Sequence, residues 1–228
     1  MPELVDKTPV VEAPVEAVKQ ELPAEDATAG NENIVPGPEL TVEINEKKLK
    51  KIVKEGGKRG VEIEGAADMG GLQFFCTMIE GPEGDLDMLV ESMKAMNAIS
   101  DPSEEERKGG AGKLGKMIFT CTDDKFSAVA YVPKDKAEDC SAHEWLCEVI
   151  MNVAESKGVA KVKSFEGIDS KYWAAVCIEL DGEAGLFPIK MRDPAISHAY
   201  AFLRKKGLFP EDDDEDDDEY VFGDDDFP

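Results

Sequence analysis

One short segment has the residue types and spacing of a phosphate-binding loop. In GGAGKLGKM, Gly110, Gly115 and Lys116 match G-x-x-x-x-G-K, in which backbone amides and a lysine surround nucleotide phosphates. The next position should be Ser or Thr, to ligate magnesium, but it is Met117. A nucleotide loop also follows a strand and opens a helix, whereas this segment follows a predicted helix and opens a predicted strand. Both tests disfavour nucleotide hydrolysis.

The same segment has a second interpretation, which is contact with a nucleic-acid backbone. Cations on or beside the glycine-rich loop would contact phosphates without reading base sequence. These predicted nucleic-acid-binding residues are Arg107, Lys108, Lys113 and Lys116. A simple connection between two elements, with no ligand, is the alternative.

A denser basic segment precedes it, with seven cations in residues 47–59. They are Lys47, Lys48, Lys50, Lys51, Lys54, Lys58 and Arg59. Three interpretations are open: a solvated helix face, a nuclear import signal of split form, and a second patch that contacts phosphates.

Metal binding and catalysis have less support. Cys140, His143 and Cys147 have the spacing C-x2-H-x3-C, which offers three ligands on one helix face, but the short paired-ligand signature of zinc sites is missing. Metal binding by these three is left open, and no cofactor is predicted. Neither His143 nor His198 has a nucleophile or paired carboxylate nearby in the sequence, so we predict a non-catalytic protein.

The C-terminal segment, residues 211–228, contains twelve acidic residues and no basic one. Its first nine residues are all acidic, which predicts an extended, solvated chain. Tyr220, Phe222 and Phe227 are not needed for solubility, and we predict that they anchor the tail to a basic partner with an apolar pocket. A purely solubilising tail is the alternative.

Capping residues and apolar periodicity predict four helices that would position these side chains. The first begins at Asn45 and ends at Gly56, with Leu49, Ile52 and Val53 as its apolar stripe. The other predicted boundaries are N-caps at Asp85, Ser141 and Asp193 and a C-terminal stop at Gly207.

β-rich runs predict a strand over residues 71–79 and two hairpins, which turn at Asp123–Asp124 and Asp181–Gly182. The second hairpin would pair residues 172–180 with residues 185–191. This order of elements predicts an α+β fold with a mainly antiparallel sheet and helices packed on one face.

The net charge of −24 is concentrated at the two ends, which divides the chain into three parts. Residues 1–40 are acidic and lack aromatic side chains, so we predict a disordered N-terminal segment. Residues 41–210 are nearly neutral and form the predicted domain, and residues 211–228 form the acidic tail. No secretory signal or membrane-length apolar run is found, and five cysteines favour reduced thiols in the cytoplasm or nucleus.

Residues 117–149 resemble part of the C-terminal, DHH-associated domain of alanyl-tRNA synthetases. The likeness rests on a strand pair ending in Val132-Pro133 and on an A-x-E-W helix with Ala142, Glu144 and Trp145, within about residues 84–206. The family's glycine-rich run after that helix is replaced here by SKGVAKVKSFEG. The resemblance implies an α+β domain that binds RNA, especially tRNA, and performs no chemistry itself.

We therefore predict a non-catalytic RNA-binding protein, with tRNA as the implied RNA, whose acidic tail masks the basic surface or recruits partners. The alternative is an adaptor or chaperone that binds basic proteins through residues 211–228. No membrane partner is predicted.

Overall fold

The computed structural model describes residues 32–38, 45–101, 103, 105–154, 161–164, 171–179 and 187–210, with side chains described for all of these except 154 and 161–164. The predicted disorder of the acidic tail, and of most of residues 1–40, falls outside these residues. Residues 32–38 do pack on the domain: the indole Nε1 of Trp173 donates to the carbonyl of Val35 (3.1 Å). The folded part therefore begins before residue 41.

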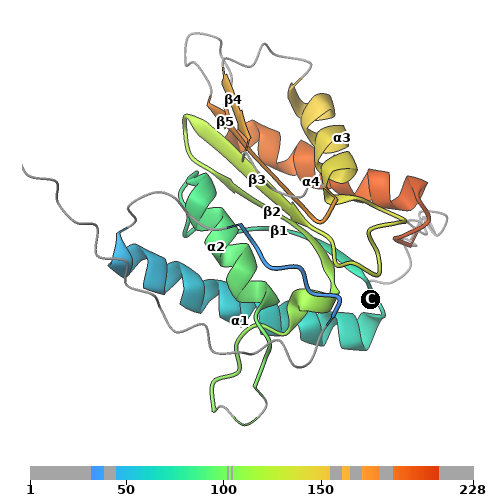
Figure 1. The fold of residues 1–228 in the computed structure, drawn as a ribbon. Helices are drawn as coiled ribbons and strands as arrows, with labels where there is room; N and C mark the ends of the chain where they lie inside the picture. The colour runs from blue at the N-terminus through green and yellow to red at the C-terminus, as the bar shows by residue number, and fades with distance from the viewer. Residues whose placement is uncertain are drawn as a thin grey trace, which may run out of the picture. The chain divides into compact units, whose positions relative to one another are not determined.

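A mixed sheet of five strands runs through the described domain in the order β1-β2-β3-β5-β4 (Figure 1). The strands are β1 (Phe74–Met78), β2 (Gly115–Cys121), β3 (Lys125–Tyr131), β4 (Lys161–Ser164) and β5 (Trp173–Glu179). β1 pairs with β2 in parallel, and the other three pairings are antiparallel. The predicted α+β class, the mainly antiparallel sheet and the first hairpin are confirmed.

Helices cover both faces of this sheet, so the prediction of helices on one face is wrong (Figure 1). They are α1 (Glu46–Gly70), α2 (Leu86–Asn97), α3 (Ala142–Ala154) and α4 (Ile189–Lys205), with a 3₁₀ turn η1 (Ala111–Lys113). Met117 and Phe119 pack with α3 and α4, whereas Ile118 packs with α1 and α2. An unbroken apolar run in a central strand requires burial on both sides, which a single helical layer cannot supply.

Helix α1 begins where the sequence predicts but ends much later. The Asn45 side chain accepts hydrogen bonds from the amides of Lys47 (3.1 Å) and Lys48 (3.4 Å), which confirms the N-cap. The predicted stop at Gly56 is wrong, because the helix continues to a left-handed Gly71 (φ 69°). A Cβ on Gly56 would lie 2.6 Å from the Ser92 carbonyl oxygen. This glycine allows two helices to approach closely and does not end one.

The C-terminal part of the domain differs from the prediction in a similar way. Helix α4 begins at Ile189 and includes Asp193 and Pro194, so the predicted N-cap is wrong, as is a strand over 189–191. The Asp193 carboxylate instead pairs with Arg192 (2.7 Å). Strand β5 pairs with β3 and β4, and the predicted turn at residues 181–182 lies outside the described residues. The stop at Gly207 (φ 70°) is confirmed.

Substituting Gly60 tests the close contact of α1 with α2. A Cβ at this position would lie 2.8 Å from the carbonyl oxygens of Met96 and Gly109, which are backbone atoms with little freedom to move. Gly60→Ala should therefore lower the free energy of unfolding by about 1–3 kcal/mol, despite alanine's higher helix propensity. In the same helix, Gly65→Ala meets no atom within 4 Å and should raise it by about 0.5–1 kcal/mol. Urea titration followed by circular dichroism measures both, and stabilisation by Gly60→Ala would contradict the contact.

Candidate nucleic-acid interface

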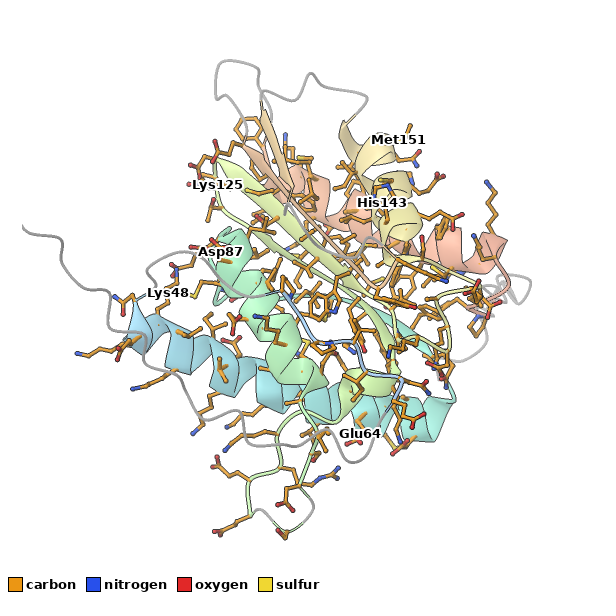
Figure 2. The ribbon with its side chains drawn as sticks, viewed as in Figure 1. Lys48, Glu64, Asp87, Lys125, His143 and Met151 are labelled. Atoms are coloured by element: carbon orange, nitrogen blue, oxygen red, sulfur yellow. The ribbon has the colours of Figure 1, made fainter. Side chains whose placement is uncertain are left out.

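Five lysines occupy the solvent side of the N-terminal half of α1, and we call this surface the basic face. Its members are Lys47, Lys50, Lys51, Lys54 and Lys58, and all are exposed. The buried residues of α1, among them Ile52, Gly56 and Gly60, face α2 and the sheet. At 3.6 residues per turn the five lysines fall on the opposite side. Figure 2 shows nitrogen-tipped side chains projecting from the side of α1 that faces away from α2.

The pairing of these cations differs across the helix. Within the described residues, ion pairs engage Lys54 with Glu106 (3.7 Å), Lys48 with Glu83 (2.9 Å) and Arg59 with Glu62 (2.7 Å). The hydrogen bond and charge of Lys48 lower the pKa of Glu83. Among the same residues, no ion pair engages the other four lysines of the basic face. Exposed pairs stabilise a fold weakly, so a phosphate can compete with these carboxylates for their cations.

The second basic segment lies directly beside α1, so the structure brings together residues that are about 50 positions apart in the sequence. The amide of Gly109 donates to the carbonyl of Gly57 (2.8 Å), and the Arg107 guanidinium pairs with Glu64 (2.8 Å). A Cβ on Gly57 would lie 3.1 Å from the Cβ of Lys108. Arg107 and Lys108, both exposed, therefore extend the cationic surface of α1.

Lys116 is not part of this surface, and its prediction as a nucleic-acid-binding residue is wrong. The side chain is fully buried, and its Nζ donates to the carbonyls of Ala111 and Leu114 (2.9 Å to Leu114). The same atom lies 4.8 Å from the ring centroid of Tyr131. Burial, with a smaller contribution from Lys136, holds the Lys116 pKa well below its ordinary value. The lysine of the apparent phosphate motif thus binds its own loop.

Tyr131 holds the same loop from the neighbouring strand. Its hydroxyl donates to the carbonyl of Gly112 (2.9 Å) and accepts from the amide of Val35 (3.4 Å). Lys113 is exposed at the outer end of this turn, where its carbonyl accepts from the Lys136 Nζ (2.8 Å). The structure therefore groups Lys113 with Lys136 and not with Arg107 and Lys108.

A groove at the basic face was missed in the sequence. It has a volume of about 340 Å³ and is lined by Leu49, Lys50, Val53, Lys54, Glu106 and Lys108. The sequence placed Leu49 and Val53 with Ile52 on one inward stripe, yet Ile52 is 1% exposed and Val53 is 41% exposed. Successive helix residues differ by about 100° in direction, so Val53 cannot share the orientation of Ile52. This angle between neighbouring helix residues was the signal in the sequence that could have predicted an exposed Val53.

The remaining predicted groups do not join the basic face. The Cys147 sulfur lies 3.4 Å from Nε2 of His143 on α3, while Cys140 is buried in the core. No group of three or more His, Cys, Asp or Glu side chains in the described parts of the chain is arranged to hold a metal. The tail residues Tyr220, Phe222 and Phe227 lie outside the described residues.

Comparisons with known proteins add no relative: no family model matches the sequence, and no curated protein matches it. The likeness to alanyl-tRNA synthetases stays a prediction. Among the helices of the described residues, none combines the length and apolar character needed to cross a membrane.

The role assigned to Lys116 predicts a large effect of its removal on stability. Lys116→Ala would leave a cavity and two buried carbonyls without their donor. The free energy of unfolding should fall by about 2–4 kcal/mol in a denaturant titration. Lys113→Ala, the matched control on the same loop, removes an exposed side chain and should cost less than about 0.5 kcal/mol. Equal effects of the two substitutions would contradict this role.

The cysteines should differ in their reactivity. Burial raises the pKa of Cys140 to about 12, so at pH 8 only about one thiol in ten thousand is ionised. Cys147 is only half-buried, and burial also raises the pKa of its thiol. In native protein treated with iodoacetamide at pH 8, mass spectrometry should detect alkylation of Cys147 well before Cys140. In unfolded protein the two should react at similar rates. A faster reaction of native Cys140 would contradict its burial.

Proposed function

We propose that the chain is a non-catalytic RNA-binding protein that holds the phosphate backbone on the basic face of α1, extended by Arg107 and Lys108. The observation that carries this proposal is the cluster of five exposed lysines on one side of one helix. The acidic residue within this stretch, Glu55, lies on another side of α1, toward Gly81. Within residues 47–58, α1 therefore places no carboxylate among these lysines, and the carboxylate that reaches the face, Glu106, comes from a loop and pairs with Lys54.

The dimensions of the basic face suit several consecutive phosphates. Lys47 and Lys58 are eleven residues apart, which is about 17 Å along a helix. One strand of a DNA duplex presents a phosphate about every 3.4 Å along its axis, and at that spacing the face spans about five phosphates. Helix α1 contains no aromatic residue on which bases could stack. The interaction we propose is thus with the backbone and reads no sequence; tRNA is the class implied by the resemblance.

The charge of the rest of the chain must oppose such binding. The net charge is −24, and half of this excess is carried by residues 211–228. A polyanion of the same chain competes with RNA for the same cations, so the acidic tail belongs to the proposal as a mask over the basic face. Binding should be strongest at low salt, where phosphate contacts release the most counterions.

Neutralising part of the basic face tests the proposal. The triple variant Lys47→Gln, Lys51→Gln and Lys58→Gln removes three cations without breaking any described ion pair. Binding of a fluorescent 20-nucleotide RNA, followed by anisotropy, should weaken by at least about tenfold at low salt. The slope of log affinity against log salt should fall by about 2 to 3.

The matched control is Lys134→Gln, Lys190→Gln and Lys205→Gln, which removes the same charge from exposed positions outside the basic face. It should retain most of the affinity. If neither the full chain nor the chain lacking residues 211–228 binds RNA at low salt, the proposal is wrong. Tail-dependent binding of basic proteins would then favour the adaptor function.

A further inference from the structure

The groove beside the basic face combines an apolar floor with a cationic rim. Leu49 is half-buried and Val53 is 41% exposed, whereas Lys50, Lys54 and Lys108 supply positive charge around them. The acidic lining residue, Glu106, is paired with Lys54. RNA phosphates would contact the cationic rim, but they would make no favourable contact with the apolar side chains of Leu49 and Val53. The floor therefore fits an occupant that carries both negative charge and an apolar side chain.

The C-terminal tail of the same chain has this composition. It places Tyr220, Val221 and Phe222 directly after nine consecutive acidic residues, and three more acids follow at positions 224–226. No basic residue interrupts the segment. Its charge is complementary to the rim of the groove, and its aromatic residues are complementary to the floor.

The described chain ends close to the sheet edge beside which α1 lies. The Phe209 ring packs on the Tyr200 ring with 4.7 Å between centroids, and the Arg204 Nε donates to the Pro210 carbonyl (3.1 Å). The Tyr200 hydroxyl in turn contacts the backbone of Cys76, the central residue of β1. These contacts fix the start of the tail at the outer edge of β1.

The same edge of β1 leads to α1. A pocket between them is lined by Arg59 and Ile63 from the helix and by Phe75 and Thr77 from the strand, among others. The path of the tail from this edge to the groove has two parts. Ile63 and Val53 are ten residues apart, or about 15 Å along α1, and crossing the thickness of each helix layer lengthens the path by about 10 Å. Residues 211–222, when extended, reach about 40 Å. The tail is therefore long enough to pass around the sheet edge to the groove.

We propose that Tyr220 and Phe222 dock into this groove of their own molecule, while the acidic residues before them cover the basic face. The docked tail then excludes RNA. This regulatory effect rests on the proposed function, whereas the docking itself does not. For an attached segment the effective concentration is about 1 mM, so a contact with an intrinsic dissociation constant of about 0.1 mM lowers RNA affinity about tenfold.

Backbone amide NMR spectra of the full chain test the docking directly. Tyr220→Ala with Phe222→Ala keeps all twelve acidic residues of the tail and removes only the aromatic anchors. The amide signals of residues 49–54 and 106–108 should shift between the native chain and this anchor variant. Coincident signals in the two chains would overturn the docking.

A pair of substitutions in α1 locates the site. Val53→Glu places a carboxylate on the floor of the groove. In this background the amide spectra of chains with the native tail and with the anchor-variant tail should no longer differ. Met69→Glu makes the same change of charge at a residue that is 88% exposed and outside the groove, and should leave the difference intact. An equal loss in both variants would indicate a general charge effect and overturn the groove as the site. Shifts that grow with protein concentration would identify the tail of a second copy and overturn docking within one molecule.

RNA anisotropy on the same variants separates the two proposals. The anchor variant should bind a 20-nucleotide RNA about tenfold more tightly than the native chain. Equal affinity would overturn the regulatory effect. If no variant binds RNA while the groove signals still shift, the docking stands and the proposed function fails.

Discussion

The close contact of α1 with α2 determines which residues of this domain meet solvent. Gly56 and Gly60 leave no room for side chains where the two helices touch, and backbone carbonyls of α2 occupy that space. This contact fixes the rotation of α1 about its axis. Once Gly56 and Gly60 face inward, the lysines that alternate with them at helical spacing must face outward. The contact at Gly56 and Gly60, which are about one helical turn apart, thus places the lysines of α1 together on one exposed surface.

Hydrogen bonds from two buried side chains of the domain hold the glycine-rich loop in place. Lys116 donates to two carbonyls of the loop and Tyr131 donates to a third, so these polar groups are satisfied without water. A nucleotide loop offers its amides to a ligand, whereas here the carbonyls receive a lysine of the same segment. The same loop places Gly109 beside α1, where its amide donates a hydrogen bond to the Gly57 carbonyl. The buried lysine therefore holds the loop that lies beside the basic face, although it is not itself part of that face.

The sequence predicted features that depend on neighbouring residues better than features that depend on distant ones. Asn45, Asp85 and Ser141 accept hydrogen bonds from nearby amides as capping residues do, and each of these helix starts is confirmed. The helix end predicted at Gly56 was wrong because a glycine that ends a helix and a glycine that packs against another helix look identical in a sequence. The helix start predicted from Asp193 and Pro194 was wrong because α4 begins about one turn before them.

The candidate site divides along the same line. The lysines of α1 could be assigned to an exposed face from composition and spacing, because charged side chains on a helix rarely bury alone. Lys116 could not be assigned, since its burial depends on carbonyls and an aromatic ring supplied by the folded loop and by β3. The groove also required the tertiary structure, because Glu106 and Lys108 reach it from a loop.

The Tyr200 hydroxyl has a consequence for how this protein can associate with others. Strand β1 is at the edge of the sheet, and the backbone amide and carbonyl of Cys76 point away from β2, where a foreign strand would otherwise pair. Tyr200 accepts from that amide at 3.1 Å and donates to that carbonyl at 3.3 Å, so one side chain occupies both positions. The edge is closed to strand addition at its centre. Association by sheet extension, including the kind that leads to aggregation, is thereby blocked on this side, and partners are left with the side-chain surfaces of the helices.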